Sequence, residues 1–106
     1  NKINTLVIFP IESASLTQPV AQEKNKGVYV IVVDRGLTNT QSQDAYIAGD
    51  NTAFGKLPAE YLAKSLNGKG NIVVLRGMPT TLDNERYDAF RPVMKGHPET
   101  KVWEAR

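Results

Sequence analysis

Short runs of β-branched and aliphatic residues recur along the chain, and they constrain its fold more than any other feature. The runs lie at residues 5–9 (TLVIF), 28–33 (VYVIVV), 45–48 (AYIA) and 72–75 (IVVL), and a fifth opens near Lys101. They are mostly apolar throughout rather than alternating, which is typical of strands buried on both faces, as in parallel sheets. We therefore expect five strands with parallel pairing.

The segments between these runs have the three-and-four spacing of helices. A first helix is expected to start from an N-cap at Ser13 or Ser15, to reach Lys26 and to stop at Gly27. Another is expected to run from residue 81 to about residue 95.

A middle helix is expected to begin near Leu57, because Pro58 disfavours a much earlier start, and to end at Asn67. Its apolar side chains predict one inward stripe. The members of this stripe are Phe54, Leu57, Tyr61, Leu62, Ser65 and Leu66.

This order predicts an α/β fold with an open, doubly wound parallel sheet. The stretch 37–44 is polar and carries no helix, although parallel neighbours usually need a crossover of about a dozen residues or more. The third strand is therefore expected to leave the first sheet. The chain would pass between two domains near Gly49 and Asp50, with residues 1–49 in one and residues 50–106 in the other.

Composition removes several classes of function. The 106 residues contain no cysteine and one histidine, His97, so thiolate metal sites, cysteine nucleophiles and Ser-His-Asp hydrolysis are not expected. The net charge of +2 comes without a basic run, which gives nucleic-acid binding no support. No apolar run approaches the roughly 20 residues of a membrane span. We expect no metal, no cofactor and no enzymatic activity.

Residues that follow the strands are the first candidates for a binding site, because ligands of open α/β sheets bind at the carboxyl ends of the strands. Asp34 and Arg35 follow the second run, and Arg86 lies near the start of the last helix, beside its apolar stripe. Aspartate accepts hydrogen bonds and arginine donates them, so the pair suits the hydroxyl groups of a sugar or polyol. A structural ion pair in a loop is the alternative for Asp34 and Arg35.

Two other features are open to rival interpretations. The segment 49–57 (GDNTAFGKL) is similar to a phosphate-binding loop, but its spacing is one residue too long and Leu57 replaces the required hydroxyl. A small flavodoxin-like enzyme that uses Asp34 and Asp50 on a metal or phosphate is another alternative. Trp103 is expected in the core of its strand.

Three stretches in this order resemble the middle third of periplasmic sugar-binding proteins, in the ribose-binding-like branch of the type I fold. They are VIFPIESASLTQPVAQEKNKGVYVIVVDRG, YIAGDNTAFGKLPAEYLAKSLNGKGNIVVLRG and DNERYDAF. The resemblance implies a two-lobed protein that closes around a sugar and delivers it to the membrane permease of an ABC transporter. It implies a periplasmic or lipid-anchored extracellular location, with no direct membrane insertion.

By the same resemblance, Asp34 and Arg35 would contact the sugar from the first lobe and Arg86 from the second, with Gly49 and Asp50 at the hinge. Phe9 stands where such proteins often have an asparagine, and its ring is suited to stack on an apolar sugar face. The alternative is the effector-binding domain of a repressor of the lactose-repressor type, which shares the two-lobed fold.

Overall fold

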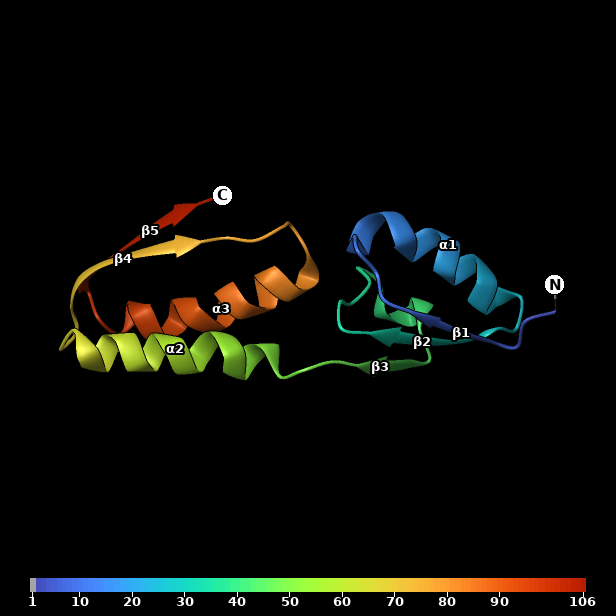
Figure 1. Cartoon of the computed structure of the whole chain (residues 1–106), viewed down its shortest axis with the longest axis horizontal. Coiled ribbons are helices and arrows are strands. Elements are labelled where there is room, and N and C mark those ends of the chain that lie inside the picture. The colour runs from blue at the N-terminus through green and yellow to red at the C-terminus, as the bar shows by residue number, and fades with distance from the viewer. Residues whose placement is uncertain (1) are drawn as a thin grey trace. The chain divides into compact units, whose positions relative to one another are not determined.

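The computed structural model describes residues 2–106 and confirms an α/β fold with parallel strands (Figure 1). The strands are divided between two sheets, ordered β1-β2-β3 and β4-β5. The elements are β1 (Thr5–Ile8), α1 (Ser13–Asn25), β2 (Tyr29–Val33), the 3₁₀ turn η1 (Thr40–Ser42), β3 (Ala45–Ile47), α2 (Asn51–Ser65), β4 (Lys69–Leu75), α3 (Thr81–Lys95) and β5 (Glu99–Ala105).

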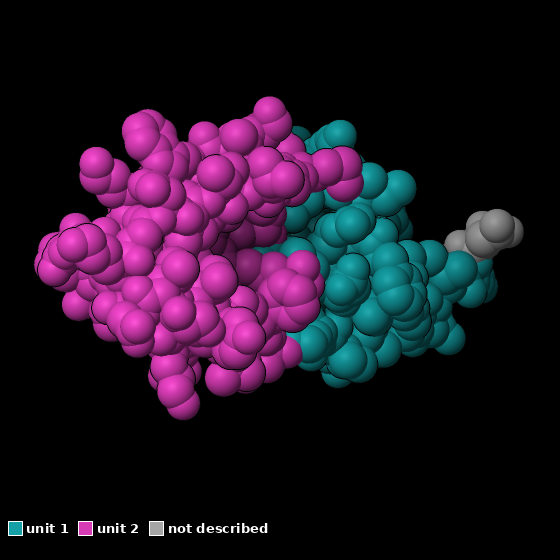
Figure 2. Space-filling view, turned by 60° about the vertical axis from the view of Figure 1, so that its left-hand side comes forward, with its two compact units in different colours: residues 1–49, 80–82 teal, residues 50–79, 83–106 magenta. Residues whose placement is uncertain are grey.

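The chain divides into two compact units, which are coloured separately in Figure 2. Unit 1 comprises residues 1–49 and 80–82, and unit 2 comprises residues 50–79 and 83–106. Each unit is described by itself below. The assignment of residues 1–49 and 50–106 to two lobes of a larger protein stays a prediction.

The third strand does not leave the first sheet, so that prediction was wrong. β3 pairs with β2 in parallel, with Ile31 opposite Ala45 and Val33 opposite Ile47. The connection through η1 suffices because β3 is three residues long and pairs only with the last three residues of β2. The chain therefore has to travel back along a short stretch, and a full crossover helix is not needed.

Lys24 and Asp44 hold this connection against α1 and β2. The Lys24 ammonium donates to the carbonyl oxygens of Gln41 and Gln43, each at 3.0 Å, and lies 3.4 Å from the Asp44 carboxylate. The same carboxylate accepts the backbone N–H of Val30 at 2.8 Å. A polar loop is thus tied to the sheet by charge-assisted bonds, which are stronger than neutral ones.

The core of unit 1 lies between α1 and one face of the sheet. It consists of Val20, Val30, Val32 and Leu37. The other face of the sheet is open, with Val7 56% and Tyr29 50% exposed. The expectation that these strands are buried on both faces was therefore wrong within the described residues.

The helix boundaries differ from prediction at two N-termini. Glu12, rather than Ser13 or Ser15, occupies the N-cap position of α1, without a side-chain cap bond. α2 begins at Asn51, several residues before the expected start. Pro58 is tolerated inside α2 at an exposed position.

The core of unit 2 lies among α2, α3 and the sheet β4-β5. It consists of Ala59, Ala63, Ile72, Phe90 and Met94. The predicted inward stripe of α2 was largely wrong, because the buried positions are Asn51, Gly55, Ala59 and Ala63. The large side chains of Phe54, Leu57 and Tyr61 are 59%, 62% and 71% exposed, and Trp103, expected in the core, is 60% exposed.

Small residues at every fourth position of α2 let α3 approach its backbone. The closest approach is at Gly55, where an added Cβ would lie 1.9 Å from the carbonyl oxygen of Arg86. Real carbon and oxygen atoms do not come so close, so this contact requires glycine. Gly55 thereby fixes where α3 crosses α2 and brings Arg86 to the first turns of α2.

Gly55→Ala is expected to lower the free energy of unfolding by about 2 kcal/mol or more, measured by urea denaturation. Alanine would gain about 1 kcal/mol in helix propensity, but the clash with a backbone atom outweighs this gain. Gly49→Ala is the control, because no described atom lies within 4 Å of the Cβ it would add. Equal stability of Gly55→Ala and the wild type would contradict the close approach.

Candidate functional site

The predicted site residues of unit 1 lie where parallel strands end. Phe9 follows β1 and Asp34 follows β2, and the parallel pairing of these strands places both residues at one edge of the sheet. The backbone of Asp34 is fixed by two contacts. Its N–H donates to the carbonyl oxygen of Ile47 at 2.8 Å, and its carbonyl oxygen accepts the hydroxyl of Tyr46 at 2.9 Å.

Asp34 has a left-handed backbone, with φ of 69°. This conformation is uncommon outside glycine, although aspartate tolerates it better than most residues. Within residues 2–106, the Asp34 carboxylate has no recorded hydrogen bond or ion pair, and neither has the Arg35 guanidinium. Phe9 is 66% exposed. The edge therefore presents an acceptor, a donor group and an aromatic ring that are not used for folding.

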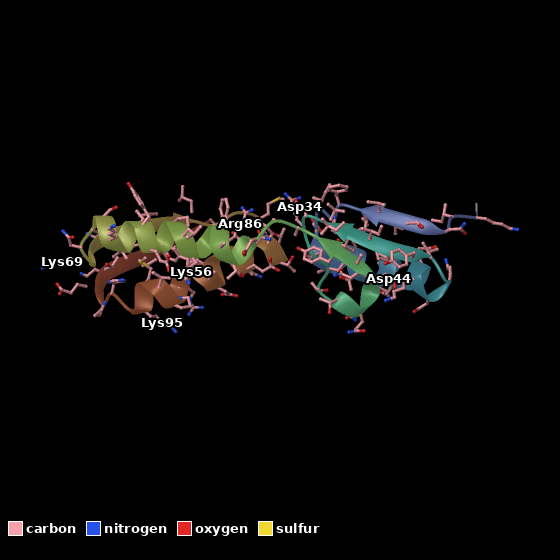
Figure 3. The ribbon with its side chains drawn as sticks, turned by 90° about the horizontal axis from the view of Figure 1, so that it is seen from below. Asp34, Asp44, Lys56, Lys69, Arg86 and Lys95 are labelled. Carbon is pink, nitrogen blue, oxygen red and sulfur yellow. The ribbon has the colours of Figure 1, made fainter. Side chains whose placement is uncertain are left out.

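Arg86 lies in unit 2, on α3 beside α2 (Figure 3). Its Nε donates to the Oδ1 atom of Asn51 at 3.1 Å, and its guanidinium carbon lies 4.0 Å from the centre of the Phe54 ring. The partners of this guanidinium within unit 2 are thus an amide oxygen and an aromatic face. Asn51 and Phe54 were missed, because their relation to Arg86 depends on how two helices cross.

The predicted hinge residues precede α2. Asp50 is the N-cap of this helix, and its carboxylate accepts the backbone N–H of Ala53 at 2.8 Å. Gly55 and Lys56 lie inside the helix, so the segment is not a phosphate-binding loop. A hinge at Gly49 and Asp50 stays a prediction.

A cluster around Arg76 was not predicted. Arg76 follows β4, and its side chain is 8% exposed. Its Nε and NH2 atoms donate to Asp83 at 2.9 and 2.7 Å, and its NH1 donates to Glu104 at 2.6 Å. The guanidinium carbon lies 4.1 Å from the centre of the Tyr87 ring, and the Tyr87 hydroxyl donates to Glu104 at 2.7 Å.

These contacts shift the acidities of the cluster. Burial acts to raise the pKa of Asp83, but the hydrogen bonds from Arg76 and from the Gly77 N–H outweigh it, so this pKa lies below its usual value. Hydrogen bonds from Tyr87 and Arg76 lower the pKa of Glu104. The bond to Glu104 also raises the pKa of Tyr87. All the charged groups are therefore held in their ionised forms at neutral pH, and the cluster has a structural character.

Other features of the described residues do not add a reactive centre. Residues 2–106 contain no group of three or more histidine, cysteine, aspartate or glutamate side chains placed to hold a metal ion. A cavity of about 230 Å³ lies between α3 and β5, lined by Phe90, Met94 and Val102 among others, and none of the predicted site residues lines it. Within the described range, no helix has both the length and the hydropathy of a membrane span.

Comparison with known proteins gives one consistent result. Residues 1–106 match the family described as periplasmic binding protein domain. A xylitol-binding protein of Mycolicibacterium smegmatis is 29% identical over 101 residues, which are 94% of this chain and 29% of that protein. The ribose import binding protein RbsB of Haemophilus influenzae is 30% identical over 93 residues, which are 87% of this chain and 32% of that protein.

Among solved structures, the fructose-binding periplasmic domain of a hybrid two-component system superposes with a TM-score of 0.89 at 36% identity. The match covers 95% of this chain and 34% of that one. The chain thus spans about a third of the length of the relatives it matches.

Asp83→Asn is expected to lower the free energy of unfolding by about 3 kcal/mol, because it leaves the largely buried Arg76 without its main charged partner. Glu99→Gln is the matched control, since Lys69 and Glu99 form a pair at 3.3 Å with side chains 77% and 69% exposed. Such exposed pairs contribute little, so the control should lie within about 0.5 kcal/mol of the wild type. Equal losses in the two variants would argue against the cluster.

The pH dependence of stability should report on the same carboxylate. Because the pKa of Asp83 is lower in the folded chain than its usual 3.8, its contribution is present above that value and is lost as the pH falls through the folded pKa. Urea denaturation between pH 7 and pH 3 should therefore show a steeper acid loss of stability in the wild type than in Asp83→Asn. Parallel curves would contradict the lowered pKa.

Proposed function

The chain belongs to the periplasmic binding protein domain family, and from this premise we propose that it forms part of the substrate-binding component of a carbohydrate ABC transporter. Proteins of this family are not enzymes. The proposed ligand is a monosaccharide or polyol, bound without chemical change between two lobes. Relatives named for ribose and for xylitol support this class of ligand.

The observation that carries the proposal is the Asp34 carboxylate at the edge of the first sheet. The residue is held in a left-handed backbone and the carboxylate has no partner within residues 2–106. A carboxylate with free lone pairs accepts hydrogen bonds from two sugar hydroxyls, and bonds to charged groups contribute about 1.5–3 kcal/mol each. An acceptor kept free of folding contacts suits a neutral ligand that is rich in donors.

Arg35 and Phe9 complement this acceptor. The Arg35 guanidinium has no recorded partner among the described residues, and it is able to donate to hydroxyl or ring oxygens. The exposed Phe9 ring offers an apolar face for the C–H side of a sugar ring. Together the three side chains supply the polar and apolar contacts that select a small carbohydrate.

In the proposed mechanism, Arg86 contacts the ligand from the second lobe after the lobes close about Gly49 and Asp50. Closure is driven by contacts that exist only in the closed state. The closed protein would then be recognised by the membrane permease of the transporter, on the periplasmic side of the membrane.

The first test is made on the native gene product that contains residues 1–106. Isothermal titration with xylitol, D-ribose and D-fructose should give saturable binding of at least one of them, and osmotic shock should release the protein. A protein that stays in the cytosol and carries a DNA-binding headpiece would support the repressor alternative. A protein that binds none of these and no related sugar would contradict the proposal.

Asp34→Gly separates binding from folding. Glycine adopts the left-handed backbone without strain, so the free energy of unfolding should stay within about 1 kcal/mol of the wild type. Loss of one or two charge-assisted bonds should weaken sugar binding about 10-fold to 100-fold, measured by calorimetry.

The contrast variant is Asp44→Asn, which weakens the bonds to Lys24 and to the Val30 N–H. It should lower stability more than Asp34→Gly and affect sugar affinity less. Wild-type affinity in Asp34→Gly would remove Asp34 from the site.

A further inference from the structure

The start of α2 carries a feature that neither a phosphate loop nor a hinge explains. Asn51, Phe54 and Gly55 lie at positions i, i+3 and i+4, so they share one side of the helix. All three meet Arg86: Asn51 through its amide oxygen, Phe54 through its ring, and Gly55 through the space it leaves for the Arg86 backbone. We refer to Asn51, Phe54 and Gly55 together as the arginine seat.

The orientation of the Asn51 amide is itself fixed. Asn51 is 7% exposed, and its Nδ2 donates to the carboxylate of Glu85 at 3.0 Å. A carboxylate only accepts hydrogen bonds, so the amide nitrogen must face Glu85 and the amide oxygen must face Arg86. The amide thus presents one defined acceptor to the Nε–H of Arg86.

The seat uses part of the guanidinium and leaves the rest available. The Nε–H is bound to Asn51 and one face of the group lies on the Phe54 ring. The four N–H groups of NH1 and NH2 have no recorded hydrogen bond to another described residue. The plane of the guanidinium is therefore fixed, while these four N–H groups remain free to donate to a ligand.

We propose that Asn51 and Phe54 are positioning residues that hold the Arg86 guanidinium in one orientation for a ligand rich in hydroxyl groups. The inference rests on the proposed function for the identity of that ligand. An arginine side chain that is already ordered loses less conformational freedom when it binds. The seat therefore increases affinity through pre-organisation, although neither Asn51 nor Phe54 needs to contact the ligand.

The first experiment compares Phe54→Leu with Tyr61→Leu in the native gene product. Both residues are exposed aromatic side chains of α2, at 59% and 71%, but Phe54 lies against Arg86 and Tyr61 is two turns further along. Phe54→Leu should weaken binding of xylitol, D-ribose or D-fructose, whichever the wild type binds, about threefold to tenfold. Tyr61→Leu should bind as the wild type does, and both variants should keep the wild-type melting temperature.

A second measurement tests the contact between the Phe54 ring and the Arg86 side chain in the absence of any ligand. The ¹H–¹⁵N signal of the Arg86 Nε–H, assigned by its loss in Arg86→Lys, should move in Phe54→Leu because the ring current is removed. It should stay in place in Tyr61→Leu. An unchanged signal in Phe54→Leu would overturn the seat, and a moved signal with unchanged sugar affinity would overturn its positioning role.

A double variant that exchanges the hydrogen-bond donor and acceptor between Asn51 and Glu85 is expected to restore the sugar affinity that a single variant loses. Asn51→Asp keeps an oxygen for Arg86 but sets a second carboxylate beside that of Glu85, and should weaken binding. Adding Glu85→Gln restores a donor opposite the introduced carboxylate and should recover most of the affinity. A double variant that binds no better than Asn51→Asp would contradict the assigned amide orientation.

Failure of the proposed function has a different signature. In that case the wild type would bind no sugar. If the wild type binds a sugar and Arg86→Ala binds it as tightly, the function stands but Arg86 is not a ligand contact, and the positioning role of the seat is overturned. If the function is correct and the seat is wrong, Arg86→Ala binds weakly while Phe54→Leu binds normally.

Discussion

Parallel pairing of the strands is the constraint on which the arrangement of this chain depends. In each unit the strands run in one direction, so the carboxyl ends of all its strands lie at the same edge of the sheet. The chain has to return along the sheet after each strand, by α1, by the turn η1 or by α3. Polar residues that follow the strands therefore collect at one edge, as Asp34 does beside Phe9 in unit 1 and Arg76 does in unit 2.

Within unit 2, the arrangement also depends on the close contact between the helices α2 and α3. Gly55, Ala59 and Ala63 make the buried side of α2 nearly flat, so the α3 backbone approaches it directly. The same helix contact that buries Phe90 and Met94 also determines the position of Arg86 along the axis of α2. The packing of unit 2 and the placing of Arg86 are thus two consequences of one row of small residues.

The sequence predicted those features that depend on neighbouring residues. The bounds of α3 and the position of Asp34 after β2 follow from local spacing and from the rule for strand ends. Asn51 was missed because it is separated from Arg86 by 35 positions and meets it only through the crossing of α2 and α3. The Arg76 cluster was missed for the same reason, since Glu104 joins it only when β5 pairs with β4.

Two of the four arginines of unit 2, Arg76 and Arg86, differ in how many of their hydrogen-bond donors find a partner within residues 2–106. Arg76 uses all three of its nitrogens on Asp83, Glu104 and their neighbours, and a guanidinium so committed has little to offer a ligand. Within the described residues, Arg86 uses only its Nε–H and one face of its guanidinium, so the N–H groups of NH1 and NH2 remain free to donate. The same contrast holds between Asp83, which is paired from both oxygens, and Asp34. Arg76 and Asp83 satisfy each other, as largely buried charges in a folded chain usually do, whereas Asp34 and Arg86 keep hydrogen-bonding groups without partners among the described residues. This difference is the reason why we propose Asp34 and Arg86, and not Arg76 and Asp83, as ligand contacts.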